Sequence, residues 1–549
     1  MKKKLILLAM VVLFMGTVSV LDAGGFSLFS KKKKKAEAVT RVNVDPTKPG
    51  WQQDTKEVEL DWYVNFGWFQ GKWGRDGASQ AMTEATGVDI NYMMPVGDGG
   101  QKINTMLASN TLPDLVTIGW WEGAYRDLIE GGYVYALDEL AKKYDPYFFE
   151  VASPEKLGWY KEADGHTYGY PNASYTKADI EEGKDSITSN YSFLVRKDIY
   201  EALGKPNMST KEGFLNTLKK AKEMYPKVGG QPLIPIGFQE FGTGESSLGG
   251  YLQDYLAIPL EKDGRAYNRR EDNEYKEWLK VFRKVNALGL ISTDVFVDKR
   301  QQIEDKMTQG RYFAILYPHI DALQPLTNIY NNNPERMYIS VDGPKNSMQE
   351  EHTFPGPAIS GWTVTFITKN CKDPEKAIRF LDYMMGDEGQ KAAFFGKEGL
   401  SWEMKNGKPE VLAEVKEMKT KNRTEYDQVH GGDYMNWMFM DNAMQERLWP
   451  AKLEGPTAQV RSYTKGKIQP RFKYERWDPS GQEKEAIIKQ KVDLRWNSTL
   501  PKLIISESDE EFDKIWNSYV KYAEKMKYST ILDYQTNKMT ENAIKLGLN

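Results

Sequence analysis

The first regular pattern in the chain is an alternation of apolar and polar residues. Residues 58–64 alternate in this way, which predicts a strand with one covered face. The pattern then predicts, in order, a helix over 77–85, a strand over 88–92, a helix over 98–109 and a strand over 113–118. Strands that alternate with helices across short connections indicate a parallel sheet covered by helices. In such sheets ligands bind beyond the carboxyl ends of the strands.

The middle and the end of the chain carry the same two kinds of pattern. Strands are predicted over 191–195 and 312–317, and helices over 196–203, 210–225 and 273–288. Near the C-terminus Ser508 and Glu511 have the spacing of a capping box. The apolar residues behind them fall on one helical face, which indicates packing and not ligand binding. The fold class is therefore α/β.

Tryptophans follow the first and third predicted strands, where a ligand would bind. Trp68 and Trp73 lie in the glycine-rich loop after 58–64, and Trp120 and Trp121 follow 113–118. A sugar ring has an apolar C–H face and a polar rim, so exposed indoles beside amides and carboxylates suit it. Any one of these tryptophans fits packing inside the fold equally well. The cluster predicts a carbohydrate site more strongly than its members do.

Composition narrows the function classes. The 549 residues are 40% hydrophobic and 28% charged, which excludes a wholly disordered chain. With 74 Lys and Arg against 77 Asp and Glu, the net charge is -3, so no basic excess favours nucleic-acid binding. Cys371 is the only cysteine, which excludes internal disulfides and cysteine-cluster metal sites.

The N-terminal segment has the pattern of an export signal. Three lysines precede an apolar stretch over 5–20, and small residues follow that suit cleavage after residue 23. We expect residues 1–23 to be a signal peptide and residues 24–54, rich in lysine, to be a flexible tether. An uncleaved membrane anchor fits the same segment, with the lysines of 31–35 at the lipid headgroups. In both cases the protein is exported, to the periplasm or the cell surface.

Several stretches, in order along the chain, resemble one family. They include a Thr-Gly-Val before the second strand, a Pro-Asp turn into the third, and a helix start with Asp373 as cap and Pro374 at its first position. The stretches are 86–88, 106–115, 131–140, 164–171, 195–198, 287–291, 367–383, 386–389 and 396–403. Together they resemble the bacterial extracellular solute-binding proteins of ABC importers, in particular the large oligosaccharide-binding type related to alginate-binding components.

The resemblance implies a two-lobed periplasmic-binding-protein-like fold of type II. Each lobe would be a mixed, mainly parallel sheet flanked by helices, with hinge crossovers near Tyr170 and Gly361. We expect an N-terminal lobe of residues 55–168 and 320–360 and a C-terminal lobe of residues 169–319 and 361–549. The family's role implies that an oligosaccharide binds between the lobes of a monomer and passes to the permease subunits of an ABC transporter, with no nucleic-acid partner and no cofactor.

The candidate ligand-binding residues combine aromatic rings for stacking with polar groups for sugar hydroxyls. For stacking we predict Trp62, Trp68, Trp73, Trp120, Trp121, Tyr168, Tyr170, Trp362 and Trp402. For hydrogen bonds we predict Asn65, Asn172, Glu240 and Glu398. Tyr168 and Tyr170 also fit simple packing of a hairpin, and Trp362 fits a hinge core.

The sequence departs from the resemblance at one metal loop. Related alginate-binding members carry a calcium loop rich in Asp and Asn after the helix that starts here at Thr210. The corresponding stretch, 225–233, offers no carboxylates, whereas calcium takes six to eight oxygen ligands. We therefore predict no metal site there.

Two other functions remain open at this stage. A glycoside hydrolase would place two carboxylates about 5 to 10 Å apart across the scissile bond, and sequence alone cannot pair them. Hydrolase and phosphate-binding motifs such as Gly-x-Ser-x-Gly do not occur. A ligand sensor that docks onto a membrane signalling protein would share every feature of a transport receptor.

Overall fold

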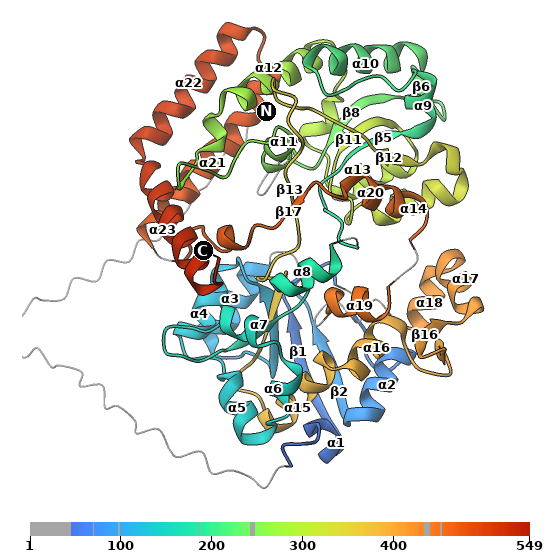
Figure 1. Cartoon of the computed structure of the whole chain (residues 1–549), viewed down its shortest axis with the longest axis vertical. Coiled ribbons are helices and arrows are strands. Elements are labelled where there is room, and N and C mark those ends of the chain that lie inside the picture. The colour runs from blue at the N-terminus through green and yellow to red at the C-terminus, as the bar shows by residue number, and fades with distance from the viewer. Residues whose placement is uncertain are drawn as a thin grey trace, which may run out of the picture. The chain divides into compact units, whose positions relative to one another are not determined.

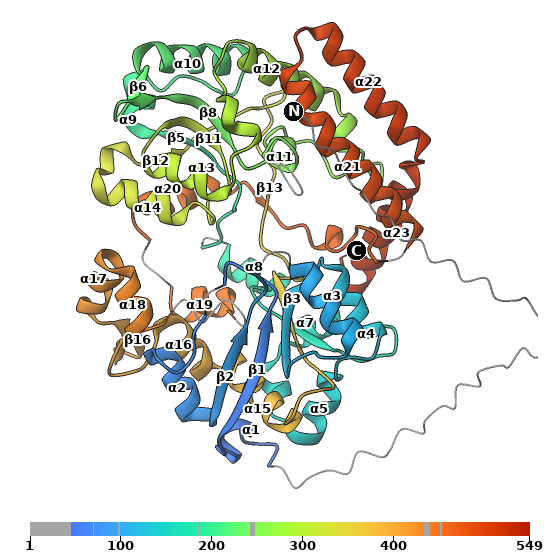
Figure 2. The same cartoon turned by 180° about the vertical axis from the view of Figure 1, so that it is seen from behind.

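The structure is a computed structural model. It describes residues 45–69, 71–96, 99–184, 186–241, 247–432, 440–450, 453–481 and 483–548. All of these belong to one compact unit, residues 41–549. They form two lobes, each built around its own sheet (Figures 1 and 2). The predicted α/β, two-lobed fold is confirmed.

The first lobe is built on a five-stranded sheet of order β2-β1-β3-β14-β4. Its strands are β1 (Val58–Val64), β2 (Val88–Met93), β3 (Leu115–Gly119), β4 (Gly169–Pro171) and β14 (Thr363–Ile367). β1 pairs in parallel with β2 and β3, whereas β14 runs antiparallel to β3 and β4. The three strands predicted from alternation near the start of the chain are confirmed.

Helices cover both faces of this sheet (Figure 1). They are α1 (Gly50–Gln53), α2 (Gly77–Thr86), α3 (Gly99–Ser109), α4 (Gly123–Glu130), α5 (Leu137–Tyr144), α6 (Phe148–Val151), α7 (Pro154–Trp159), α15 (Pro374–Met385) and α16 (Asp387–Phe395). A hairpin and two helices follow α16, namely β15 (Trp402–Lys405), β16 (Lys408–Val411), α17 (Ala413–Lys421) and α18 (Arg423–Val429). The Asp373 side chain accepts from the Lys376 amide, so the predicted cap of α15 is confirmed.

The second lobe is built on a four-stranded sheet of order β12-β5-β11-β8. Its strands are β5 (Phe193–Arg196), β8 (Ile234–Phe238), β11 (Tyr312–Leu316) and β12 (Tyr338–Ser340). Its helices are α9 (Lys197–Ala202), α10 (Lys211–Met224), α11 (Gly250–Tyr255), α12 (Asn273–Ala287), α13 (Arg300–Thr308), α14 (Leu323–Asn332), α20 (Gly455–Thr464), α21 (Lys484–Ile505) and α22 (Asp509–Lys525). Two small hairpins complete it, β6 (Lys227–Val228) with β7 (Gln231–Pro232) and β9 (Glu261–Lys262) with β10 (Arg265–Ala266).

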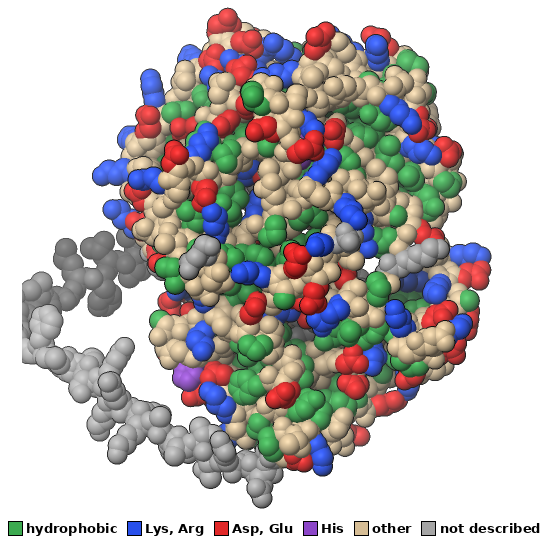
Figure 3. Space-filling view, in the orientation of Figure 1, with side chains coloured by type: hydrophobic (Ala, Val, Ile, Leu, Met, Phe, Trp, Pro, Cys, Tyr) green, Lys and Arg blue, Asp and Glu red, His purple; other side chains and the backbone are tan. Residues whose placement is uncertain are grey.

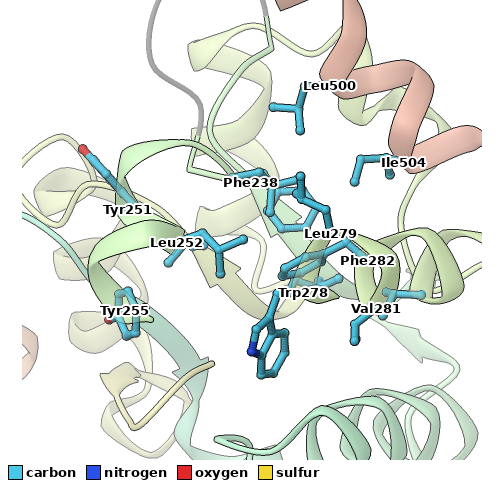
Figure 4. Close-up of a cluster of buried hydrophobic side chains, with 14 of the residues drawn as sticks. Phe238, Tyr251, Leu252, Tyr255, Trp278, Leu279, Val281, Phe282, Leu500 and Ile504 are labelled. Atoms are coloured by element: carbon cyan, nitrogen blue, oxygen red, sulfur yellow. The ribbon is translucent and has the colours of Figure 1, made fainter. Parts of the chain in front are cut away.

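The core of the second lobe joins segments that are far apart in the chain. Figure 4 shows Trp278 and Phe282 of α12 in one cluster with Tyr255 of α11 and Leu500 of α21. Trp278 is fully buried, and its indole N–H donates to the Lys345 carbonyl at 2.9 Å. The apolar stripe of α22 packs into the same cluster, which confirms that it is core.

Several segments run between the lobes. They are α8 (Lys177–Gly183), β13 (Phe354–Pro355), α19 (Asn442–Leu448), β17 (Ile468–Gln469) and α23 (Ser529–Lys545). β13 and β17 pair in parallel, so two of these segments run side by side. At the end of α23 the Lys545 ammonium donates to the Trp159 carbonyl of the first lobe at 2.6 Å.

The lobe boundaries differ from those expected, because strands expected in one lobe belong to the sheet of the other. Residues 320–360 were expected in the first lobe, but β12 pairs with β5 of the second sheet. Residues 169–319 and 361–549 were expected in the second lobe, but β4 and β14 lie in the first sheet. The physical reason is that β14 covers the open edge of β3, a pairing between distant segments that the local pattern does not encode.

The expected tether is partly folded. Within 24–54, the described residues include α1, which packs on the first lobe with Trp51 edge-on to Tyr383 at 5.1 Å. The Gly50 amide donates to Asp145 Oδ1 at 3.1 Å. Asp145 is fully buried beside a second buried carboxyl, Asp382 of α15. This buried acidic pair therefore lies beneath α1.

The remaining expectations for the start of the chain fall outside the described residues. These are the signal peptide 1–23 and the first part of the tether, 24–44. Within the part of the chain that the structure describes, no helix combines the length and the apolar character needed to cross a bilayer. Acidic and basic side chains are interspersed on the face shown in Figure 3.

Candidate functional site

Five aromatic rings gather where β1 and β3 end. They are Phe66, Trp68, Trp120, Trp121 and Trp362, and we call them the aromatic shelf. Trp68 and Trp121 are 51% and 49% exposed, which is unusual for such large apolar side chains. Figures 1 and 2 show that β1 points its carboxyl end toward the second lobe. The shelf is therefore at the edge of the sheet where the strand order predicts a ligand.

Ring contacts fix the shelf. Trp362 stacks on Phe66 at 5.1 Å and on Trp68 at 5.8 Å between ring centroids, with interplanar angles of 25° and 24°. Trp120 and Trp121 meet edge to face at 5.7 Å. Such aromatic pairs contribute about 0.5–1.5 kcal/mol each beyond their buried area. Trp68 and Trp121 are thus held from one side while a large part of each indole faces solvent.

Polar groups lock the loops beneath the rings. Asn65 is buried, accepts from the Tyr63 hydroxyl at 2.6 Å, and donates to the Glu122 carboxylate. Glu122 also accepts from the Gly119 amide at 2.8 Å. A Cβ on Gly119 would lie 2.6 Å from the Trp121 ring, so only glycine leaves room for that indole. The loop after β3 is therefore shaped to present Trp121.

Trp362 reaches the shelf from a tightly bonded hinge. The Asn172 side chain accepts from the Thr363 amide at 2.6 Å, and the Asn172 carbonyl accepts from the Trp362 amide at 3.1 Å. The Trp120 indole N–H donates to the Gly361 carbonyl at 3.1 Å. Asn172 is buried, so it acts here on the backbone of the hinge.

Gly361 can be tested for its part in this hinge. Its φ is +63°, and an added Cβ would lie 2.1 Å from the Asn172 carbonyl oxygen. Gly361→Ala should therefore lower the free energy of unfolding by about 2–4 kcal/mol, since left-handed strain and a backbone clash add. Urea unfolding measures this. Gly407→Ala is the matched control, because Gly407 has φ +75° and nothing within 4 Å, so it carries the strain without the clash. Equal losses for the two variants would contradict the prediction.

The second lobe contributes polar groups at its own strand ends. Glu240 follows β8, is half-buried, and accepts from the Arg300 amide at 2.8 Å. His319 follows β11 and is buried, and burial together with the charge of Arg461 lowers the pKa of its imidazole to about 4. His319 is therefore neutral at ordinary pH.

Three of the predicted tryptophans are structural. Each donates its indole N–H inside the first lobe: Trp62 to Thr117 Oγ1 at 2.8 Å, Trp73 to Thr83 Oγ1 at 2.8 Å, and Trp402 to the Gly396 carbonyl at 2.7 Å. Trp62 and Trp402 are buried, and Trp73 packs against the same core as Trp62. Trp62 is unsuited to a strand-end ligand because it lies within β1, not after it.

The other predicted residues away from the shelf are also accounted for. Tyr170 is buried and its hydroxyl accepts from the Ser153 amide at 3.1 Å. The Tyr168 hydroxyl donates to Asp164 at 2.6 Å within its own hairpin. Glu398 is an exposed residue of the turn before β15. The structure thus brings together Asn65, Trp68, Trp120, Trp121 and Trp362, with Asn172 behind them, and leaves the others elsewhere.

One shelf residue, Phe66, and one residue that supports the shelf, Glu122, were not among the candidates. Phe66 supplies a stacked ring and Glu122 supplies the carboxylate that joins the two loops. Their signal in the sequence is proximity, because each lies within two residues of one that was selected. Phe66 was not predicted because the sequence prediction favoured tryptophan, whose ring is larger.

Two cavities at the junction of the lobes are lined by residues outside the aromatic shelf. Their volumes are about 590 and 400 Å³, and Lys177 and Phe472 line both. The larger also reaches Ile258 and Arg471, and the smaller reaches Trp159. Neither cavity is lined by any of the described residues that were predicted to contact a ligand. The aromatic shelf, with its exposed indoles, remains the candidate site.

Comparison with known proteins gives one curated relative with a stated role. The chain is 26% identical over 235 residues to the fructooligosaccharide ABC transporter substrate-binding protein FusA of Streptococcus pneumoniae serotype 4. The alignment covers 40% of this chain and 41% of that protein, which is less than half of either.

Solved structures share the whole fold. FusA of S. pneumoniae in complex with kestose superposes with a TM-score of 0.66 at 17% identity, covering 88% of this chain and 99% of that one. The alginate-binding protein AlgQ2 without calcium ion gives a TM-score of 0.65 at 17% identity, covering 90% and 100%. An HMO-binding, ABC-transporter-associated solute-binding protein of Bifidobacterium longum infantis gives 0.61 at 14% identity, covering 88% and 99%.

The family assignment comes from a direct match. The family model described as bacterial extracellular solute-binding protein matches residues 71–391, more than half of the 549-residue chain. The matched range includes most strands of both sheets and the residues of the aromatic shelf except those of β1 and its loop. The chain therefore belongs to the bacterial extracellular solute-binding protein family.

Proposed function

We propose that the protein binds an oligosaccharide between its lobes and delivers it to the permease of an ABC importer. The observation that carries this proposal is the pair of half-exposed indoles, Trp68 and Trp121, held rigidly at the carboxyl edge of the first sheet. Exposed aromatic side chains that gather at one place on a protein surface mark a candidate binding site.

The chemistry of the shelf suits a sugar. Indole planes pack on the C–H face of a pyranose or furanose ring, and polar groups nearby bind its hydroxyls. Two indoles on separate loops suit a ligand of more than one ring. The relatives support this class, since FusA is named for fructooligosaccharides and AlgQ2 for alginate.

The two lobes supply the mechanism of capture. Closure about the hinge around Asn172 and Gly361 brings the strand ends of the second lobe over a ligand on the shelf. The affinity then includes the free energy of closing, and the closed form is the one that a permease recognises. We propose an exported monomer in the periplasm or at the cell surface that binds no nucleic acid and releases its ligand unchanged.

Calorimetric titration with a panel of oligosaccharides tests this function. The panel contains fructooligosaccharides, alginate oligosaccharides and milk oligosaccharides, and we expect micromolar or tighter binding of at least one class with a shift in tryptophan fluorescence. The ligand is then recovered and analysed by chromatography. Unchanged sugar supports the receptor, whereas cleaved sugar supports the hydrolase hypothesis. Absence of binding across the panel would overturn the carbohydrate assignment.

Binding alone does not separate an importer receptor from a sensor. Reconstituting the protein with ABC-importer permease subunits from the same organism, and measuring ligand uptake into vesicles, separates them. Uptake that depends on this protein supports transport. Ligand-dependent association with a membrane signalling protein, without uptake, would replace the importer assignment.

A further inference from the structure

The loop that carries Trp362 is bonded along its whole length. Residues 358–361 have four consecutive carbonyls, and each accepts a hydrogen bond. The donors, in order, are the Tyr175 amide at 3.0 Å, the Ser174 hydroxyl at 2.5 Å, the Tyr160 hydroxyl at 2.5 Å and the Trp120 indole at 3.1 Å. A loop with every carbonyl bonded cannot reorient without breaking bonds. The direction of Trp362 is therefore set from behind the shelf.

Tyr160 occupies the central position in this arrangement. It follows α7, is buried, and reaches the Ser360 carbonyl. The neighbouring Trp159 donates its indole N–H to the Ser360 hydroxyl at 3.1 Å. Ser360 is fully buried, so both bonds lie in a medium of low polarity, where they are stronger than in water. Neither Tyr160 nor Trp159 belongs to the shelf.

A segment that follows β17 contacts Tyr160 in turn. The Arg476 guanidinium lies 5.2 Å from the centre of the Tyr160 ring and 4.6 Å from that of Tyr125. The carboxyl of Glu475, in the same segment, lies beside Ser360. The segment thus contacts the Trp362 loop directly through Glu475 and indirectly through Tyr160.

The other end of this segment is fixed to the second lobe. Arg471 donates to both oxygens of the buried Asp254, at 2.8 and 3.1 Å, and to the Thr353 carbonyl at 2.6 Å. The next residue, Phe472, is buried in the core of the first lobe. Residues 471–476, which we call the strap, therefore connect an ion pair in one lobe to the support of the Trp362 loop in the other.

From these contacts we propose that Tyr160 and Arg476 are positioning residues, which orient Trp362 for the ligand and connect it to the second lobe through the strap. This inference rests on the proposed function, because it assigns a role to residues behind the same shelf. Neither residue touches the ligand. A change in either alters binding by allowing Trp362 to turn, and movement of the second lobe reaches the shelf through Arg471.

Tyr160→Phe tests the inference with the loss of one hydroxyl. We expect the affinity for whichever panel sugar binds the unaltered protein to fall about fivefold to tenfold, as for one buried hydrogen bond. The near-ultraviolet circular dichroism of the ligand-free protein should also change, since Trp362 follows the bonded loop and the Trp120 indole donates to it. Arg476→Lys keeps the charge but not the planar face, and should give a smaller change of the same kind.

Tyr125→Phe is the matched control. Tyr125 is buried and faces the same guanidinium, but its hydroxyl donates to Glu162 at 3.2 Å and not to the loop. A merely structural role would give both tyrosine variants the same spectrum and the same affinity, and that result overturns the inference. If the unaltered protein binds no panel sugar, the proposed function fails separately, and the two spectra still decide whether Tyr160 positions the Trp362 loop.

Discussion

Replacing Trp68 and Trp121 together by alanine should lower oligosaccharide affinity by about 100- to 1000-fold. Each indole is about half exposed and is held from behind by other shelf rings, so each presents a rigid face to a sugar. Rigid aromatic anchors in binding sites contribute about 2 kcal/mol or more, which is roughly 30-fold in affinity. The single variants should each lose about 10- to 30-fold in calorimetric titration.

The control for this loss is an exposed ring elsewhere on the same lobe. Phe149 is 36% exposed and lies edge-on to Phe148 at 5.6 Å, outside the shelf. Phe149→Ala should leave affinity unchanged. The double variant should also lose about 1–3 kcal/mol of unfolding free energy, because Trp68 and Trp121 each give up a ring pair within the shelf. Affinities are therefore compared at a temperature where every variant is fully folded. A double variant that still binds its sugar with full affinity would disprove the role of the shelf.

The second large effect concerns pH and stability, not binding. Asp382→Asn should raise the free energy of unfolding at pH 8 and above by about 1–3 kcal/mol. This is the cost of keeping the ionised Asp382 carboxylate buried without enough hydrogen-bond partners, and the variant removes that cost. Asp382 is fully buried, and burial followed by the charge of Asp145 raises the pKa of its carboxyl to about 8. Burial also raises the pKa of Asp145, to about 6. The pair therefore retains a proton at neutral pH, which one carboxyl can donate to the other.

The sign of the pH dependence follows from these raised pKa values. In the unfolded chain both carboxyls ionise near 4, so folding takes up a proton at neutral pH. The contribution of the pair is fully present below about pH 4 and is lost as pH rises through about 8. The side-chain amide introduced by Asp382→Asn can donate to Asp145 without taking up a proton. The variant should therefore lose the part of this dependence that Asp382 contributes, while burial still raises the pKa of Asp145.

Urea unfolding at pH 5 and pH 9 checks this prediction. The unaltered protein should lose more stability between these values than Asp382→Asn does. Asp127→Asn, at an exposed position of α4, is the control and should follow the unaltered protein. If Asp382→Asn and the control show the same pH dependence, the buried pair does not hold a proton.

Local patterns predicted the elements of the first lobe closely. The alternation over 58–64 is β1 residue for residue, and the helix expected over 77–85 is α2 to within one residue. Asp373 and Pro374 marked the start of α15, because capping and the missing proline N–H are properties of the adjacent backbone. Such features depend on neighbours in sequence, which is why one sequence suffices to find them.

The sequence could predict a site residue only where a side chain that follows a strand is also exposed to solvent. Trp68, Trp120 and Trp121 lie near one another because they follow strands whose carboxyl ends meet at one edge, and their contact with a ligand stays a prediction. Trp62 and Trp402 were not distinguishable from them by residue type, although both indoles bond inside the fold. Whether an indole faces solvent depends on residues that are distant in the sequence and close in the fold. A single sequence does not show which residues these are.

The position of β14 between β3 and β4 has a consequence for how the protein is made. β3 emerges early in synthesis, whereas its partner β14 follows only after the whole second sheet. During that interval the nascent chain exposes an unpaired edge of β3, whose five residues are all buried in the folded protein. Such an edge can pair with the wrong strand. A chain kept unfolded by a chaperone until residue 367 is available would avoid this wrong pairing, so the yield of folded protein should rise with chaperone level.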